Sequence, residues 1–124
     1  MKSKSFKDLL VWQKSMELVR YSYEIAAQLP NHELYALGDQ IRRSSVSISS
    51  NIAEGSKRNG VKEFYQFCGI ARGSAAELET QLLVVKMLHS NIDTSKALEL
   101  NTQVQKMLTK LAQSLQMSKP KTTN

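Results

Sequence analysis

Apolar residues recur along most of the chain in alternating steps of three and four, which is the spacing of one face of an α-helix. Four stretches carry this pattern. Their apolar positions are Leu9, Trp12, Met16, Val19, Tyr23 and Ala26; Leu34, Leu37, Ile41, Ile48 and Ile52, with Ser44 or Ser45 in between; Val61, Phe64, Cys68, Ala71, Ala75, Leu78, Leu82 and Val85; and Ala97, Leu100, Val104, Met107 and Leu111. We therefore predict four amphipathic helices. The first covers about residues 6–28, and the second ends at Gly55 in a left-handed turn.

The links between these stretches are short and polar, around residues 30–32, 56–60 and 91–93. Short links force consecutive helices to lie antiparallel. We predict an all-α fold, an antiparallel up-down-up-down four-helix bundle that forms one domain over residues 1–117. Residues 118–124 form a lysine-rich polar tail that we expect to be flexible.

A second apolar stripe complicates the first helix. Val11, Leu18 and Ile25 repeat every seven residues, with Tyr21 nearby, roughly 130° around the helix from the first stripe. One interpretation is a wide core face, which is common in globular helices. The other is a subunit interface, because exposed apolar patches of this size are rare on monomers. We favour the interface and predict that the protein forms homo-oligomers.

Small residues gather in the second and third stretches. Five serines lie within residues 44–50, and Gly69, Gly73 and Ala76 form a matching stripe in the third stretch. Each glycine costs a helix about 1 kcal/mol relative to alanine. Close contact between helices or between subunits is the better explanation for such residues, so we predict close packing along both faces.

The chain has 124 residues and a net charge of +6, with a pI near 9.6. This excess favours anionic partners such as nucleic acid, although many solvated domains reach it without binding anything. The longest apolar run near the N-terminus has four residues, 9–12, too few for a signal peptide or a membrane span. We predict a cytoplasmic protein without a membrane partner.

Five cations flank the serine-rich stretch: Arg42, Arg43, Lys57, Arg58 and Lys62. Together they form a candidate phosphate-binding strip around the end of the second helix. The alternative is a surface of weak ion pairs, because Asp39 precedes Arg42 and Arg43 by three and four residues and Glu54 precedes Arg58 by four. In an oligomer the strip would be repeated, and multivalency would strengthen weak contacts.

Catalytic patterns are absent from the sequence. His32 and His89 stand in no metal-binding spacing, and there is no glycine-rich phosphate loop or nucleophile elbow. Cys68 falls on a core position, which predicts a small buried thiol rather than a nucleophile. We predict no catalytic residues, no metal, no cofactor and no small-molecule substrate.

Several segments carry a family resemblance that spans nearly the whole chain: FKDL at 6–9, VWQK at 11–14, QIRR at 40–43, NIAEG at 51–55 and IARGS at 70–74. With these segments the chain resembles the bacterial 23S ribosomal RNA intervening-sequence proteins, also called the four-helix bundle protein family. The alanine that usually follows the two arginines in that family is Ser44 here.

The resemblance implies properties that the spacing does not show. Relatives assemble as rings of five, and a similar bundle, the accessory protein of diversity-generating retroelements, binds nucleic acid and a reverse transcriptase. Asn51, Glu54 and Gly55 match the family motif, and we expect them to brace a helix end rather than touch a ligand. The expected protein is a non-catalytic homopentamer that engages RNA or a ribonucleoprotein. The alternative is a scaffold that binds only itself or a protein partner.

Overall fold

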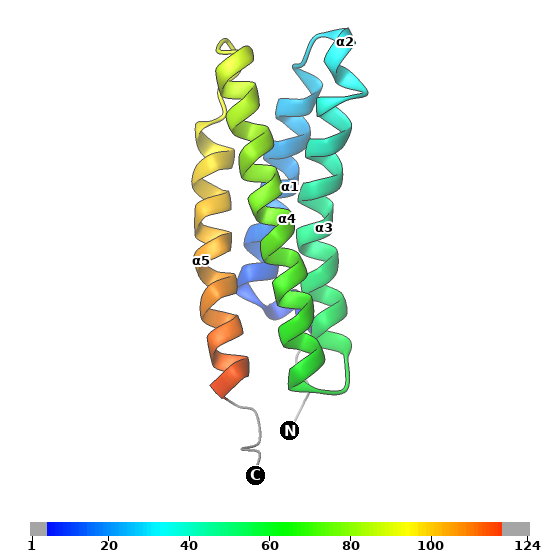
Figure 1. Ribbon diagram of the computed structural model, residues 1–124, viewed down its shortest axis with the longest axis vertical. Helices are drawn as coiled ribbons and strands as arrows, with labels where there is room; N and C mark the ends of the chain where they lie inside the picture. The colour runs from blue at the N-terminus through cyan, green and yellow to red at the C-terminus, as the bar shows by residue number, and fades with distance from the viewer. Residues whose placement is uncertain (1–4, 118–124) are drawn as a thin grey trace.

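The computed structural model describes residues 5–117, and the predicted tail at 118–124 lies outside them. The described residues form a short 3-10 helix, η1 (Phe6–Asp8), and the helices α1 (Leu10–Ala27), α2 (Asn31–Leu34), α3 (Leu37–Lys57), α4 (Val61–Leu88) and α5 (Ser95–Met117), without any strand. The prediction of an all-α fold with four long helices is confirmed. The long helices lie side by side, with α2 and the α4–α5 link at one end of the bundle and the α3–α4 link at the other (Figure 1).

Each long helix packs against two others. α1 contacts α3 and α5, and α4 contacts the same two helices from the opposite side, with the α3–α4 contact the most extensive. One core runs between all four helices, and its largest fully buried side chains include Leu18, Ile48, Leu82 and Leu108. Burial of each such side chain stabilises the folded state by roughly 1.5–3 kcal/mol. Because the helices are stabilised by this burial, the spacing of the apolar residues predicts where the helices lie.

The predicted core stripes of α3 and α4 are confirmed over most of their length, although Leu34, which belongs to α2, and Val61 and Phe64 are only half-buried. Ile41, Ile48 and Ile52 are fully buried, and the α4 stripe is buried from Cys68 to Val85. In α5 the stripe is partly displaced, because Leu108 and Ala112 are buried while Met107 and Leu111 only pack against the edge of the core. An α-helix has 3.6 residues per turn, whereas a seven-residue repeat has an average spacing of 3.5 residues. A strict seven-residue repeat therefore drifts away from the buried face along the helix.

The interface that we predicted on α1 is wrong. Val11, Leu18 and Ile25 are 7%, 0% and 4% exposed and form the core of the chain itself, and Tyr21 packs half-buried against that core. The stripe through Met16 and Tyr23, which we assigned to the core, is instead largely open, at 43% and 45% exposed. The buried face of α1 is therefore centred on the second stripe, while Ala26 of the first stripe is also fully buried and Leu9 and Trp12 pack against the edge of the core.

Serine explains this difference from the prediction. Ser15 and Ser22 complete the buried heptad of α1 between the three apolar residues, and both are fully buried. The Ser15 hydroxyl donates a hydrogen bond to the Trp12 carbonyl oxygen at 2.7 Å and shares another with Ser49 Oγ at 2.8 Å. Because these bonds satisfy Ser15, a small polar residue fits where the hydrophobic pattern predicts an outward face.

Gly55 does not end α3 in a left-handed turn. The helix continues to Lys57, and no described glycine has a positive φ. A Cβ atom added at Gly55 would lie 2.7 Å from Phe67 Cβ and 2.9 Å from Phe64 Cδ1. The glycine is needed because α4 approaches α3 too closely there for any side chain.

The helix ends are held by specific polar contacts. Asp93 Oδ1 accepts hydrogen bonds from the Ser95 hydroxyl at 2.6 Å and from the Ser95 N–H at 3.0 Å, and these bonds lower the pKa of the Asp93 carboxyl. These bonds fix the backbone at the start of α5. At the same end of the bundle His89 Nε2 lies 3.1 Å from Glu33 Oε2, which ties α2 to the end of α4.

Candidate nucleic-acid interface

Arg42 holds the start of α3 in place. Its guanidinium donates to the Leu34 carbonyl oxygen at 3.0 Å and to the Asp39 carboxylate, and its side chain is only 23% exposed. The backbone between α2 and α3 turns here, and the guanidinium satisfies a carbonyl that the short helix leaves free. Arg42 is therefore engaged within the chain.

Arg58 is also engaged. It pairs with Glu54 at 2.8 Å and lies 3.7 Å from Glu63, and its guanidinium carbon sits 5.0 Å from the centre of the Phe67 ring. These contacts join the end of α3 to the first turns of α4. For these two arginines the structure favours the alternative interpretation of the charge pattern, a surface of ion pairs.

Arg43, Lys57 and Lys62 behave differently. All three are exposed, and no carboxylate among residues 5–117 lies within ion-pair distance of them. Their charges are therefore available to external anions, such as the phosphate groups of a nucleic acid.

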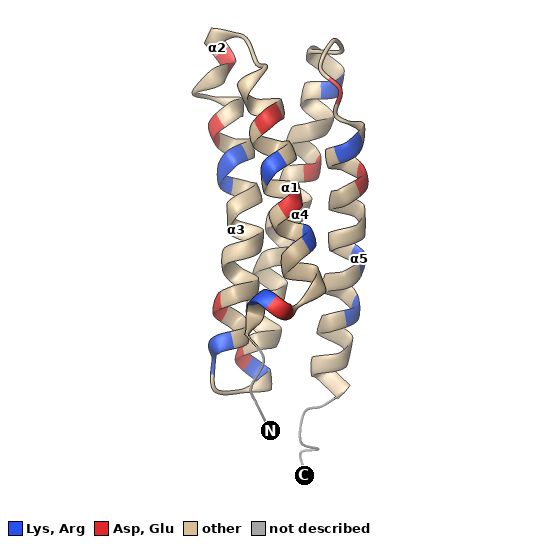
Figure 2. Cartoon of the chain, turned by 180° about the vertical axis from the view of Figure 1, so that it is seen from behind, with Lys and Arg blue, Asp and Glu red and all other residues tan. Residues whose placement is uncertain are grey.

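The five predicted cations do not form one strip. Arg43 and Lys57 stand fourteen residues apart on α3, a rise of about 21 Å along the helix. Figure 2 shows the basic positions near both ends of α3, with acidic positions beside them and an uncharged segment between. Our prediction of a continuous strip is wrong, because the spacing of the residues along a straight helix separates them into two groups.

The three family-motif residues make contacts within the chain. Asn51 Nδ2 donates to the Ser47 carbonyl oxygen at 2.8 Å and to Ser47 Oγ at 3.1 Å. Ser47 Oγ in turn shares a hydrogen bond with Ser74 Oγ on α4, at 2.8 Å. With Glu54 bound to Arg58 and Gly55 packed under α4, the motif lies along the closest contact between two helices.

Three cations outside the predicted strip lie together on another face. Arg72 on α4 and Lys106 and Lys110 on α5 are exposed and line adjoining hollows between these helices. One sequence feature points to this face: α5 has no acidic residue after Glu99, although it continues to Met117. Carboxylates three or four residues away are the local partners of helix cations, so their absence leaves Lys106 and Lys110 without such a partner.

The described residues offer little reactive chemistry. Among residues 5–117 no group of three or more His, Cys, Asp or Glu side chains is placed to hold a metal ion. Cys68 is fully buried as predicted, and burial raises the pKa of its thiol to about 11, against a smaller opposing effect of Arg72. A thiol that stays neutral near pH 7 is a poor nucleophile. None of the described helices is long and apolar enough to cross a lipid bilayer.

The fold and surface define a class: a small protein of four long helices whose exposed faces carry cations without carboxylate partners. The sequence model of the family described as 23S rRNA-intervening sequence protein matches residues 7–113. The chain belongs to that family. A comparison with curated proteins gives no significant match.

Proposed function

We propose that this protein is a non-catalytic, up-down-up-down helical bundle of the bacterial cytoplasm that binds RNA through its unpaired surface cations. Arg43, Lys57 and Lys62 form the contacts on the α3 side, whereas Arg42 and Arg58 position the backbone around them. The observation that carries the proposal is the absence of any ion-pair partner for these three exposed cations among the described residues. Family membership supports it, because the description of the family names an intervening sequence of 23S ribosomal RNA.

The proposal includes self-association through a different face of α1. Trp12, Met16 and Val19 of α1 and Val46 and Ala53 of α3 line a shallow apolar hollow. Met16 and Val46 are 43% and 40% exposed. An apolar surface between two helices favours a second copy of the chain as its cover, and the resemblance suggests a ring of five. The same hollow favours the scaffold alternative, in which the protein binds only itself or a protein partner.

RNA binding is tested by removing the free charges. In the triple variant Arg43→Gln, Lys57→Gln and Lys62→Gln, affinity for a fluorescein-labelled 20-nucleotide uridine oligomer should fall. The slope of log K against log salt should become shallower by about 0.7 for each phosphate that the variant no longer binds. Fluorescence anisotropy between 50 and 200 mM salt measures both quantities.

A matched control removes the same total charge elsewhere, with Lys14→Gln, Lys86→Gln and Lys96→Gln. Lys14 and Lys96 are already paired with Glu17 and Glu99, and Lys86 belongs to neither cation cluster, so this variant should bind almost as the wild type does. Equal losses of affinity in the two triple variants would show a net-charge effect without a binding surface. A wild-type protein that binds no RNA would reject the proposal and leave the scaffold alternative.

Self-association is tested with Met16→Glu and Val46→Glu. A charge in the hollow should reduce the mass measured by light scattering while circular dichroism keeps its helical signal, because both side chains are exposed in the single chain. Leu83→Glu is the control, since Leu83 is 46% exposed on α4. A wild-type monomer at micromolar concentration would contradict the expectation.

A further inference from the structure

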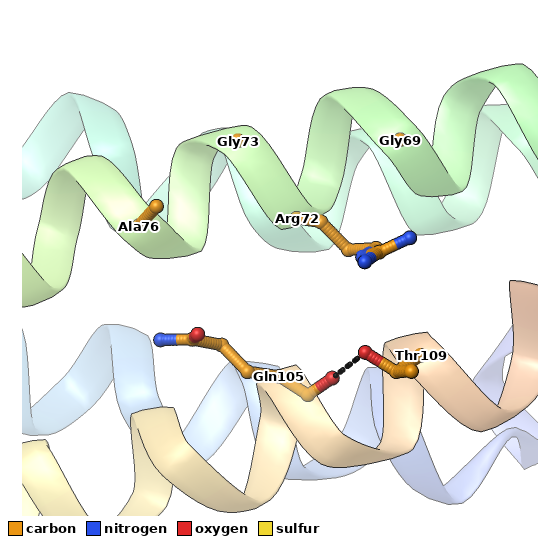
Figure 3. Close-up of a pocket in the computed structure, with 6 residues that line it drawn as sticks. All are labelled: Gly69, Arg72, Gly73, Ala76, Gln105 and Thr109. Atoms are coloured by element: carbon orange, nitrogen blue, oxygen red, sulfur yellow. Dashed lines mark hydrogen bonds between the residues drawn. The ribbon is translucent and has the colours of Figure 1, made fainter.

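A groove runs along the outer surface between α4 and α5. Its lining residues are Gly69, Arg72, Gly73 and Ala76 from α4 and Gln105 and Thr109 from α5. An adjoining hollow shares Gln105 and Thr109 and adds Lys106 and Lys110. Figure 3 shows Arg72 extended from α4 into the space between the helices, with Thr109 opposite it on α5 and the Gln105 side chain directed toward the side of Ala76. The groove thus has a floor of small residues and cationic walls.

The three cations of the groove have no ion-pair partner among the described residues. Arg72, Lys106 and Lys110 are exposed, and no carboxylate of residues 5–117 lies within 4.0 Å of their nitrogens. Figure 2 shows basic positions without acidic ones over the part of α5 nearer the C-terminus. Lys106 and Lys110 are one turn apart and lie on one side of the helix. Their charges therefore add along the groove.

One carboxylate, Glu79, lines the far part of the adjoining hollow. Its Oε1 accepts a hydrogen bond from Gln105 Nε2 at 2.9 Å, so the side chain is held by α5. Glu79 stands seven residues from Arg72 on α4, a rise of about 10 Å. The positive part of the groove is therefore the part between Arg72 and Lys110.

Packing within the chain does not explain the glycines. A Cβ atom added at Gly69 or at Gly73 would meet nothing within 4 Å. Each glycine nevertheless costs an interior helical position about 1 kcal/mol relative to alanine. An open floor without side chains lets the backbone of a ligand approach α4 closely, as glycines do at other phosphate-binding surfaces.

The remaining lining groups suit a sugar-phosphate chain. The Thr109 hydroxyl donates to the Gln105 carbonyl oxygen at 3.0 Å, which leaves its own oxygen free to accept from a ribose hydroxyl. Gln105 offers an amide oxygen and a second N–H beyond its bond to Glu79. A docked protein helix needs large apolar anchors in its groove, and the residues that line this one are small, polar or charged.

We propose that the α4–α5 groove binds the phosphodiester backbone of single-stranded RNA, with Arg72, Lys106 and Lys110 contacting phosphates and Gly69 and Gly73 forming the floor. The inference rests on the proposed function, because it assigns that function a second surface. A strand held here lies on α4 and α5, and the groove shares no cation with the surface of Arg43, Lys57 and Lys62, so the two surfaces are separable by mutation.

The test compares two triple variants against the same fluorescein-labelled 20-nucleotide uridine oligomer. The groove variant is Arg72→Gln, Lys106→Gln and Lys110→Gln, and the α3 variant is Arg43→Gln, Lys57→Gln and Lys62→Gln. The groove variant should bind at least tenfold more weakly at 50 mM salt. Its salt slope should be shallower by about 2, from three phosphate contacts at about 0.7 each.

A second variant tests the floor without changing any charge. Gly69→Ala with Gly73→Ala should raise the melting temperature, because alanine favours the helix and meets no neighbour. The same variant should bind the oligomer several-fold more weakly, since two methyl groups raise the floor. If the glycines do not contact a ligand, the variant should have a raised melting temperature but the same affinity for the oligomer as the wild type.

The outcomes separate the two proposals. Wild-type binding by the groove variant, with weakened binding by the α3 variant, would overturn the groove and leave the proposed function standing. Poly-L-glutamate serves as a second probe. If the groove variant binds poly-L-glutamate more weakly than the wild type but binds the RNA oligomer equally well, the groove is a site for an acidic polypeptide, and the inference is overturned. Weaker RNA binding by the groove variant would support the groove proposal. It would be established if the Gly69→Ala, Gly73→Ala variant also has a raised melting temperature and binds the oligomer more weakly.

Discussion

Gly55 and Gly73 are both interior helical glycines, and their surroundings are opposite. Gly55 lies on α3 beneath α4, where an added Cβ would come within 3.0 Å of two phenylalanines. Gly73 lies on α4 beside α5, where an added Cβ would meet nothing. The first glycine is explained by packing inside the chain. Packing inside the chain does not explain the second, and the proposed α4–α5 groove rests partly on that observation.

The same contrast holds for the polar residues of the two regions. Between α3 and α4 the polar groups bind one another, as Ser47 does with Ser74 and Asn51. Along the α4–α5 groove the cations bind no described carboxylate. A region whose polar groups are satisfied within the chain is built for stability, whereas unsatisfied exposed charge leaves capacity for a ligand.

The largest expected effect comes from truncating isoleucine on the packed side. Ile48→Ala should lower the free energy of unfolding by about 2–5 kcal/mol, because Ile48 is fully buried between the helices. Ile70→Ala on the open side of α4 should change it by less than about 0.5 kcal/mol, since Ile70 is 51% exposed. Urea denaturation followed by circular dichroism measures both. Similar losses of stability at the two positions would show that the open side is covered in solution.

The glycines themselves give the next largest effect. Gly55→Ala should destabilise the protein by about 1–3 kcal/mol, because the new methyl group forces α3 and α4 apart. Gly73→Ala should stabilise it by about 1 kcal/mol through helix propensity alone. Thermal unfolding of the two single variants gives the comparison directly. A stabilised Gly55→Ala variant would mean that α3 and α4 pack less closely in solution.

The smallest expected effect concerns pH. Cys68 is buried on α4 next to Gly69, and burial raises the pKa of its thiol from 9.0 to about 11. The unfolded chain therefore loses this proton at lower pH than the folded chain does. The stability that this thiol contributes is fully present below pH 9 and is lost as the pH rises toward about 11. The full pKa difference corresponds to roughly 2–3 kcal/mol, but none of this loss occurs near neutral pH, where the effect is the smallest of the three.

Cys68→Ala isolates this contribution from the lysines and tyrosines that titrate in the same range. Urea denaturation at pH 8 and at pH 10.5 should show a smaller loss of stability in the variant than in the wild type. Equal losses in the two proteins would mean that the thiol is exposed to solvent.

The helices and most of the core are predictable from the sequence because large apolar side chains at helical spacing must be buried together. The stripes of α3 and α4 show this, from Ile41 to Ile52 and from Cys68 to Val85. The failure on α1 has the same cause. Ser15 and Ser22 are buried in its heptad, and a search for hydrophobic residues misses small polar residues that are buried, whether they are hydrogen-bonded as Ser15 is or without a partner as the Ser22 hydroxyl is.

The candidate binding residues are less predictable. The order of residues shows where cations stand along the chain, but it does not show which of them carboxylates neutralise. Arg42, Arg43 and Arg58 all have the local spacing of ion pairs. The structure shows Arg42 and Arg58 engaged, whereas Arg43 has no carboxylate partner among the described residues. Arg72 and Lys106 lie far apart in the chain, and only the packing of α4 against α5 brings them to one groove.

The sequence by itself determined that this chain forms four amphipathic helices and belongs among basic, helical proteins, because periodicity and charge are properties of residues and their order. The tertiary structure alone decided which face of α1 is buried and which glycine is crowded. It also decided which of the described cations remain without a carboxylate partner. Those properties depend on distances between atoms from different helices, and such distances exist only once the helices have packed.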